Sequence, residues 1–138
     1  MQENVDQNLL RIIDANLNRV REGLRVCEDV CRFILNKEDE TARFKNIRHH
    51  LSKICLMVDF KEILKARNIE ADVGVHSTVS ELTRENVTDI FLANAQRVKE
   101  SIRVLEEFYK LIDKNVAQEI KSTRYQFYAL EKRIAQEF

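Results

Sequence analysis

The sequence predicts an all-α protein, and two observations lead to this class. The chain has 138 residues with Pro 0, Gly 2 and 33% charged residues, a composition that suits long helices and leaves few residues for tight turns. Apolar residues recur every three or four positions in residues 15–34, as in one face of a helix. The same pattern returns in residues 93–112, so we expect long helices that occur in two copies.

Residues 15–34 and 93–112 are an internal repeat. They read A-N-L-N-R-V-R-E-G-L-R-V-C-E-D-V-C-R-F-I and A-N-A-Q-R-V-K-E-S-I-R-V-L-E-E-F-Y-K-L-I, offset by 78 positions. Average residue usage would give about one identity over such a window. The identical pairs are Ala15/Ala93, Asn16/Asn94, Arg19/Arg97, Val20/Val98, Glu22/Glu100, Arg25/Arg103, Val26/Val104, Glu28/Glu106 and Ile34/Ile112.

The repeat extends into a second pair of helices, at an offset of 76 positions. We therefore expect a single domain over 1–138, in which internally duplicated antiparallel helix pairs, about 7–57 and 86–136, form a four-helix bundle with short extra helices in the crossover. The corresponding residues are Phe44/Ile120, Lys45/Lys121, Arg48/Arg124, Leu51/Phe127 and Ile54/Leu130.

The helices of the first half follow from capping residues and apolar spacing. The first helix is expected to run from near Asp6 to about Leu35, followed by a polar turn in which Asp39 is a plausible N-cap. The second is expected over about 40–57. Asp59 would then cap a short helix over 60–66, with Glu62 completing a capping box.

The helical period fails over residues 67–77, which we expect to be a loop. Thr78 followed by Glu81 predicts that a short helix starts there. Asn86 or Thr88 leads into the helix of the second repeat, which should end near Ile112. A final helix is expected over about 115–136, capped by Asp113.

Composition narrows the class of protein. Lys+Arg 23 and Asp+Glu 23 give a net charge of +0, which argues against nucleic-acid binding. No apolar run approaches the roughly 18 residues of a membrane span, and the first residues lack a signal-peptide pattern. We therefore expect a cytoplasmic protein with no membrane partner. Its three cysteines are interpreted as small core residues.

Polar residues lie inside the apolar stripe of each repeat. On a helical wheel Asn16 and Arg19 fall among apolar residues, as do Asn94 and Arg97, whereas Glu28 falls on the expected solvated face. Burying such groups costs several kcal/mol unless they are paired. Two interpretations stay open. Either Arg19 pairs with Glu22 or Glu100 in a structural network, or the axis relating the copies holds a polar ligand site, with Gly23 and Ser101 leaving room.

The candidate site residues suit a small anionic ligand. Arginine offers a fork to phosphate, and asparagine can read a ring edge. Glu22 and Glu100 could orient the arginines or bind Mg²⁺, which prefers one or two carboxylates plus substrate phosphates. Glu131 is interpreted as an arginine partner or a site carboxylate. The candidate set is Asn16, Arg19, Glu22, Arg48, Asn94, Arg97, Glu100 and Arg124, with a possible contribution from Asp72 and Gly74.

Several stretches over nearly the whole chain carry a family resemblance. The longest is residues 13–26 with Glu28-Asp29, and the supporting ones are residues 47–51, 72–74, 97–100 with 103–107, and 124–125 with 130–132. They resemble a helical domain found fused to some bacterial thiamine-phosphate synthases, regarded as an alternative hydroxymethylpyrimidine-phosphate kinase. No Walker P-loop or kinase-type glycine loop is present in the sequence.

The resemblance implies a thiamine-biosynthesis protein that phosphorylates hydroxymethylpyrimidine phosphate with Mg-ATP. The candidate residues would then line the site for a small phosphorylated pyrimidine, with Arg48 and Arg124 neutralising phosphate charge. The competing interpretation is a non-catalytic helical module that binds a thiamine precursor or docks a thiamine-phosphate synthase. A homodimer is compatible with either interpretation.

Overall fold

The computed structural model describes residues 6–55 and 60–138, apart from the side chain of Ser80, and all regular structure in these ranges is helical. This confirms the all-α class. None of the helices in these ranges combines the length and apolar character needed to cross a membrane. The helices are α1 (Gln7–Asp29), which continues as a π-helical turn (Val30–Leu35), α2 (Glu38–Cys55), α3 (Phe60–Ala66), α4 (Val79–Leu82), α5 (Val87–Tyr109) and α6 (Lys114–Ala135).

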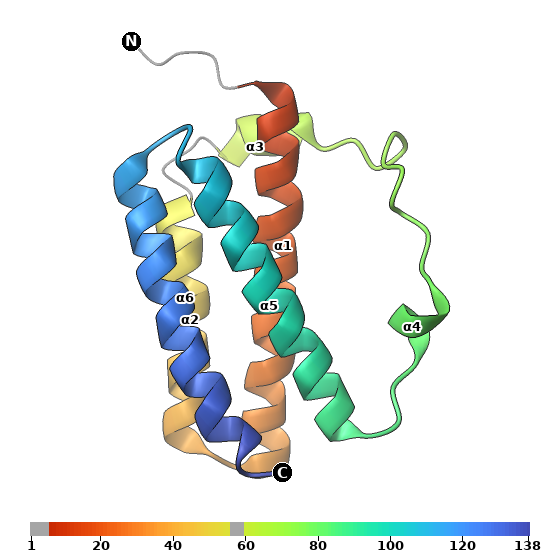
Figure 1. Ribbon diagram of the computed structural model, residues 1–138, viewed down its shortest axis with the longest axis vertical. Coiled ribbons are helices and arrows are strands. Elements are labelled where there is room, and N and C mark those ends of the chain that lie inside the picture. The colour runs from red at the N-terminus through yellow and green to blue at the C-terminus, as the bar shows by residue number, and fades with distance from the viewer. Residues whose placement is uncertain (1–5, 56–59) are drawn as a thin grey trace.

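The four long helices form two antiparallel pairs that pack on each other (Figure 1). α1 pairs with α2, and α5 pairs with α6. α1 also crosses α5, which is its most extensive contact, and α2 contacts α6, so each long helix packs against two others. The short α3 covers the remaining side of α1. The crossing of α1 and α5 therefore brings together residues 15–34 and 93–112, which share the sequence pattern described above.

The core between the helices is apolar and well filled. The ring of Phe44 on α2 makes edge contacts with Phe91 on α5 and Phe127 on α6, at centroid distances of 6.3 and 6.1 Å. Tyr109 is fully buried, and its hydroxyl donates a hydrogen bond of 2.8 Å to the carbonyl of Cys55. These contacts connect three of the four long helices.

The cysteines are core residues, as predicted. All three are buried and free. Burial raises the pKa of the Cys31 and Cys55 thiols to about 12, and it raises the pKa of Cys27 still further. At pH 8 the reactive thiolate is therefore almost absent.

We expect the folded protein to resist thiol labelling at pH 8. A maleimide reagent should leave Cys27, Cys31 and Cys55 unmodified in native buffer and modify all three after unfolding in guanidinium, as measured by mass spectrometry. Rapid modification of any one of them in the native protein would contradict the burial described above.

Side-chain N-caps begin α1, α4, α5 and α6 at or near the positions that the sequence predicts. Asp6 accepts from the backbone N–H of Asn8 at 2.8 Å, Thr78 caps α4, and Asn86 and Asp113 cap α5 and α6. The prediction of Asp39 as an N-cap is wrong, because α2 already begins at Glu38.

The earlier start of α2 has a local cause. Asn36 takes the left-handed conformation, with φ 54°, which ends the preceding helix and lets the chain re-enter a helix two residues later. Glu38, Asp39 and Glu40 all lie in the first turn of α2, where the helix dipole favours acidic residues. The predicted end of this helix near residue 57 and the cap at Asp59 lie outside the described residues.

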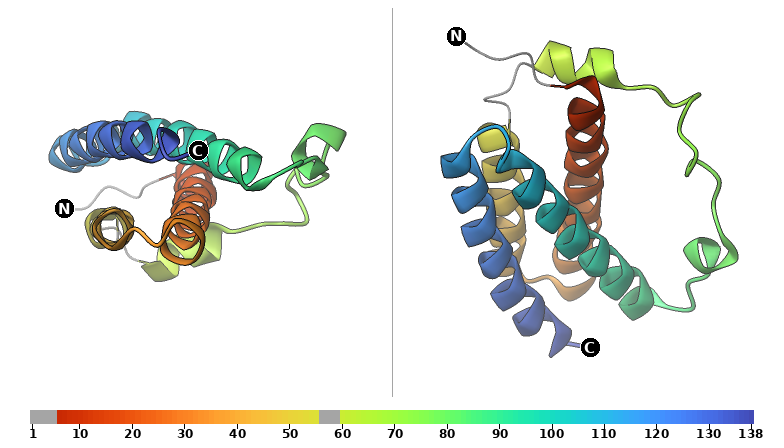
Figure 2. Two further views of the ribbon diagram at one scale, coloured as in Figure 1. Left: turned by 90° about the horizontal axis from the view of Figure 1, so that it is seen from below. Right: turned by 45° about the horizontal axis from the view of Figure 1, so that its top comes forward.

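Residues 67–86, here called the crossover segment, include α4 and run at a distance from the four long helices (Figures 1 and 2). Arg67 anchors the first end through two hydrogen bonds to the buried Asp14, of 2.8 and 2.7 Å. Every side chain described in the segment is exposed. Its exposed apolar residues are Ile69, Val73, Val75, Val79 and Leu82.

Candidate functional site

The candidate site lies where α1 crosses α5, and the crossing is built around Gly23. A Cβ atom added to Gly23 would lie 2.8 Å from Val98 Cγ2 and 3.1 Å from the carbonyl oxygen of Asn94. The expectation that Gly23 leaves room for a ligand is therefore wrong, because the opposite helix fills that space. Ser101, its counterpart, is buried, and its hydroxyl donates to the carbonyl of Arg97 at 2.6 Å.

The two asparagines of the repeat take the same local arrangement. The side-chain amide of Asn16 donates to the carbonyl of Ile12, and that of Asn94 donates to the carbonyl of Ile90, both at 2.8 Å. Asn16 is buried and Asn94 is half-buried. The Oδ1 atom of Asn16 accepts from Arg19 Nη1 at 3.3 Å. Each asparagine is thus held by a carbonyl of its own helix, and the oxygen of Asn16 also accepts from Arg19.

Arg19 and Arg97 are exposed, so the burial that their place inside the apolar stripe of the helical wheel predicts is wrong. The buried side of α1 is a broad arc. One edge, at Asn16 and Gly23, lies next to α5. The other edge, at Glu28 and Asp14, lies next to α2 and α3. At about 100° per residue, Arg19 lies just beyond the α5 edge of this arc. No helix in the described ranges covers that position, and the symmetrical argument applies to Arg97.

Among the arginines that recur in both halves of the sequence, these two are the pair without a carboxylate partner in the described residues. Arg25, Arg48, Arg103 and Arg124 all form ion pairs, whereas neither Arg19 nor Arg97 does so within the described residues. Glu22 is likewise exposed and unpaired in these ranges, and Glu100 accepts only from Gln96, at 3.1 Å. The sides of the crossing therefore carry free charges of both signs.

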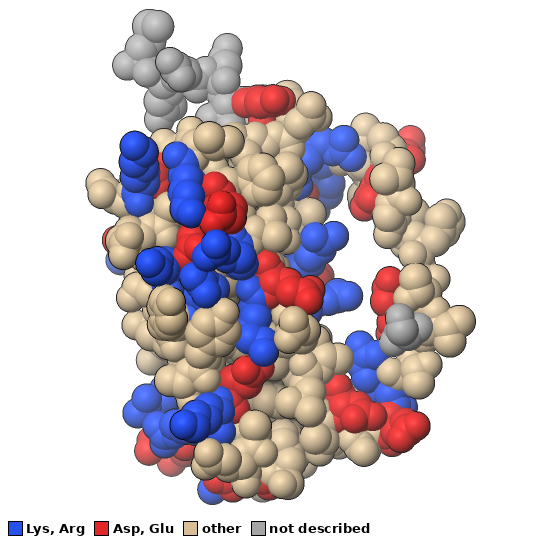
Figure 3. Space-filling view, in the orientation of Figure 1, with Lys and Arg blue, Asp and Glu red and all other residues tan. Residues whose placement is uncertain are grey.

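The surface near the crossover segment is open. In the space-filling view, basic side chains of the helical body project into the gap between the body and the segment (Figure 3). Asp72 and Gly74 lie on that segment, where Asp72 Oδ1 accepts from the backbone N–H of Gly74 at 2.9 Å. No hydrogen bond or ion pair among the described residues joins either of them to the crossing.

Arg48 and Arg124 occupy a different environment, between the helices of each pair. Arg48 Nε and Nη2 donate to Glu28 Oε1 at 3.3 and 3.1 Å, which ties α2 to α1. Arg124 Nη2 donates to Glu106 Oε1 at 3.3 Å, which ties α6 to α5. The glutamates are almost fully buried, at 3% and 2% exposure.

The expectation that Glu28 is solvated is therefore wrong, because α2 covers that side of α1. The sequence contained a signal for these pairs. Glu28 recurs as Glu106, and Arg48 recurs as Arg124. A glutamate and an arginine that recur together could have been predicted to form an ion pair in each half. Glu131 also has a partner, but a lysine, Lys99, at 3.2 Å.

A metal would have to be held by few protein ligands. Among the described residues no three His, Cys, Asp or Glu side chains are grouped as a metal site. Glu22 and Glu100 are exposed on separate helices. Mg²⁺ can bind through one or two carboxylates plus substrate phosphates, and magnesium binding by Glu22 and Glu100 stays a prediction.

The fold and these side chains define an all-helical protein whose two antiparallel helix pairs present the same Asn, Arg and Glu residues at their crossing. The chain belongs to the ThiD2 family, whose model matches residues 11–133.

The chain is also similar to curated proteins over most of its length. The chain is 41% identical over 133 residues to a thiamine-phosphate synthase of Nostoc punctiforme, and the match covers 96% of this chain and 37% of that protein. It is 39% identical over 124 residues to one of Rhodopirellula baltica, covering 89% and 33%. The chain thus spans about a third of the length of these relatives. No solved structure matches it significantly.

Proposed function

We propose that the protein acts in thiamine biosynthesis and phosphorylates hydroxymethylpyrimidine phosphate to the diphosphate. Membership of the ThiD2 family and the similarity to thiamine-phosphate synthases support the pathway. The observation that carries the proposed chemistry is the pair of arginines, Arg19 and Arg97, that flank the crossing and have no carboxylate partner among the residues the structure describes. An unpaired guanidinium is available to bind phosphate oxygens in two-point contact.

The reaction would join an oxygen of the substrate phosphate to the γ-phosphorus of ATP, and the bond from that phosphorus to the β–γ bridging oxygen would break, releasing ADP. Such transfers depend mainly on positioning and on charge stabilisation. Arg19 and Arg97 would bind the phosphates, and Asn94, through its side-chain oxygen, would orient the pyrimidine. A magnesium ion held by Glu22 and Glu100 would neutralise phosphate charge.

Arg48 and Arg124 would act indirectly in this proposal. Both guanidinium groups are engaged by buried glutamates, so they set the position of α1 and α5 rather than contact the ligand. Asp72 and Gly74 would join the site only through movement of the crossover segment toward the crossing.

We also propose that the two helix pairs derive from one ancestral pair and form a duplicated four-helix bundle. Support comes from three contacts repeated in both halves. The asparagine donates to the carbonyl four residues before it, the exposed arginine pairs with the buried glutamate, and the arginine of the partner helix pairs with that same glutamate. Superposition of residues 7–55 on 86–131 tests this proposal, which requires these contacts to coincide.

Arg19→Met and Arg97→Met are expected to lower turnover of hydroxymethylpyrimidine phosphate with Mg-ATP at least about tenfold each, equivalent to about 1.4 kcal/mol. Exposed substitutions usually change stability by less than about 0.5 kcal/mol, so urea melts should be unchanged. The product is measured by ³¹P NMR. Arg21→Met, which removes another exposed arginine of α1, is the matched control and should retain full activity.

Absence of diphosphate formation by the wild-type protein would contradict the kinase proposal. Equal losses in Arg21→Met and Arg97→Met would contradict the proposed site, since only a general effect of charge could then explain them.

The second candidate function is a non-catalytic module that docks a thiamine-phosphate synthase. The exposed apolar side chains of the crossover segment favour it, since Val73, Val79 and Leu82 are each more than three-quarters exposed and apolar groups gain stability when a partner covers them. Calorimetric titration with a synthase distinguishes the two functions. Binding that Val73→Ser and Leu82→Ser abolish, without any phosphorylated product, would favour the module.

A further inference from the structure

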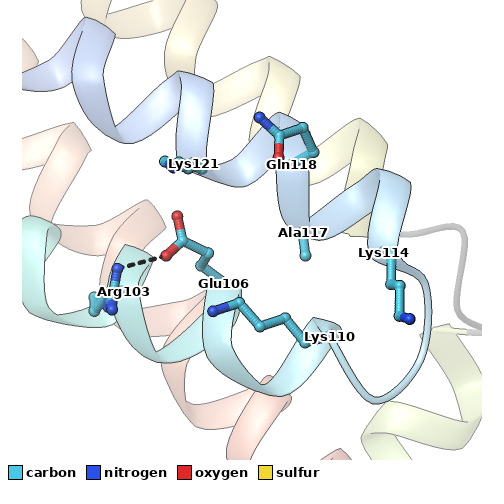
Figure 4. Close-up of a pocket in the computed structure, with 7 residues that line it drawn as sticks. All are labelled: Arg103, Glu106, Lys110, Lys114, Ala117, Gln118 and Lys121. Atoms are coloured by element: carbon cyan, nitrogen blue, oxygen red, sulfur yellow. Dashed lines mark hydrogen bonds and ion pairs between the residues drawn. The ribbon is translucent and has the colours of Figure 1, made fainter.

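A second feature, a surface cavity of about 400 Å³ that is open to solvent, lies between α5 and α6 (Figure 4). Four basic side chains and one carboxylate, that of Glu106, line it. Arg103 comes from α5 and Lys110 from the C-terminal end of that helix, and Lys114 and Lys121 come from α6. Ligand cavities of about 300 to 1,000 Å³ are typical of small-molecule sites. The cavity therefore has the size for a small ligand and a strong excess of positive charge.

The nearby carboxylates are engaged with the α5 cations. Glu106 accepts from Arg103 Nη1 at 2.8 Å and from the buried Arg124 behind it at 3.3 Å. Glu107, outside the lining, pairs with Arg103 at 3.2 Å and with Lys110 at 2.7 Å. Neither lysine of α6 in the lining has a carboxylate partner within the described residues. Two amine groups are thus left for an external anion.

The first copy of the repeat provides a comparison. α2 begins at Glu38 and α6 begins at Lys114, which is the equivalent position. α2 has three acidic residues in its first turn, whereas α6 has none. A cation at a helix N-terminus opposes the helix dipole. α6 therefore begins with a lysine on the wall of the cavity, at a position where local helix stability favours an acid.

We propose that this cavity binds a small polyphosphate anion with two or more phosphate groups. A chain of linked phosphates has several negative charges along its length. It could contact both lysines of α6 and also the cations of α5, Arg103 and Lys110. Ammonium groups bind phosphate as point charges without strict geometry. The amide of Gln118 in the lining supplies a neutral donor and acceptor for the rest of the ligand.

The cavity is separate from the crossing of α1 and α5. Glu106 follows Arg97 by nine residues, or two and a half helical turns, which places the two side chains on opposite sides of α5. This site thus goes beyond the proposed function and does not depend on it.

Calorimetric titration with inorganic tripolyphosphate tests the proposal on the full chain. Lys114→Glu/Lys121→Gln should lower the affinity at least tenfold relative to the wild type. The matched control is Lys45→Gln/Lys53→Glu, which makes the same change in net charge with two exposed lysines of α2. The control should keep its affinity within threefold, and thermal melts should show that both variants are folded.

Three outcomes would overturn the proposal. The first is no binding of tripolyphosphate by the wild type at millimolar concentration. The second is equal loss of affinity in the two double variants, which would indicate a general charge effect. The third is orthophosphate binding as tight as that of tripolyphosphate, which would show that linked phosphates are not recognised. Kinase activity is measured separately on the same proteins, so failure of either proposal leaves the other standing.

Discussion

Arg124→Met lowers the free energy of unfolding by about 3 to 5 kcal/mol in our expectation, the usual result of breaking a buried ion pair from one side. Glu106 would keep a buried negative charge whose remaining partner, Arg103, is half-exposed. The substitution also removes the hydrogen bond from Arg124 Nη1 to the hydroxyl of Tyr128. Urea denaturation monitored by circular dichroism measures the change.

A double substitution separates charge from packing. In Glu106→Leu/Arg124→Met both charges are replaced by apolar groups, which is often close to neutral for a buried pair. We therefore expect most of the lost stability to return. Arg103→Met, which removes only the exposed partner, should cost less than about 1 kcal/mol. If the double variant were as unstable as Arg124→Met alone, the ion pair would not explain the loss.

Gly23→Leu is expected to destabilise the protein by at least about 3 kcal/mol, at the upper end of what overpacking costs. Even a single added carbon would lie within 3.1 Å of the Asn94 carbonyl oxygen, and that backbone atom cannot rotate away. The gain of about 0.8 kcal/mol from replacing a helical glycine is too small to compensate. α1 and α5 would have to separate, which also opens the core beside Val98.

The other glycine of the chain is the control for this experiment. At Gly74 the nearest atom to an added Cβ is Asp72 Oδ1, at 3.5 Å, which is an ordinary contact, and its φ is not positive. Gly74→Leu should therefore change stability by less than about 0.5 kcal/mol. Thermal melts of both variants are compared with the wild type. A Gly23→Leu protein as stable as Gly74→Leu would contradict the close approach of the helices.

The helices were predictable because their signals are local. The caps Asp6, Thr78, Asn86 and Asp113 accept hydrogen bonds from backbone N–H groups only two or three residues away, so the sequence around each one contains the whole interaction. The cap at Asp39 failed because a single residue, Asn36, ended the preceding helix in a left-handed conformation. Asparagine adopts this conformation only in some contexts, and the sequence does not show which.

The burial of the candidate side chains was less predictable, because a helical wheel describes one helix and not its neighbours. Arg19 looks internal on the wheel, but only α5 covers the adjacent part of that side. Glu28 looks solvated, but α2 lies over it. The position of each neighbouring helix depends on contacts far apart in the sequence, such as that between Gly23 and Val98. The spacing of polar residues therefore predicts which residues are unusual, but it does not predict whether each one is buried or exposed in the folded protein.

The crossover segment also determines how the polypeptide can be divided. It is anchored near its start by Arg67 and Asp14, and its exposed side chains contribute nothing to the core. A break between residues 75 and 76 would leave both helix pairs and their crossing uncut. Each fragment alone would expose the apolar face that the other covers. Two separately synthesised fragments should therefore recombine into the native fold, which would make this protein a natural scaffold for a split reporter.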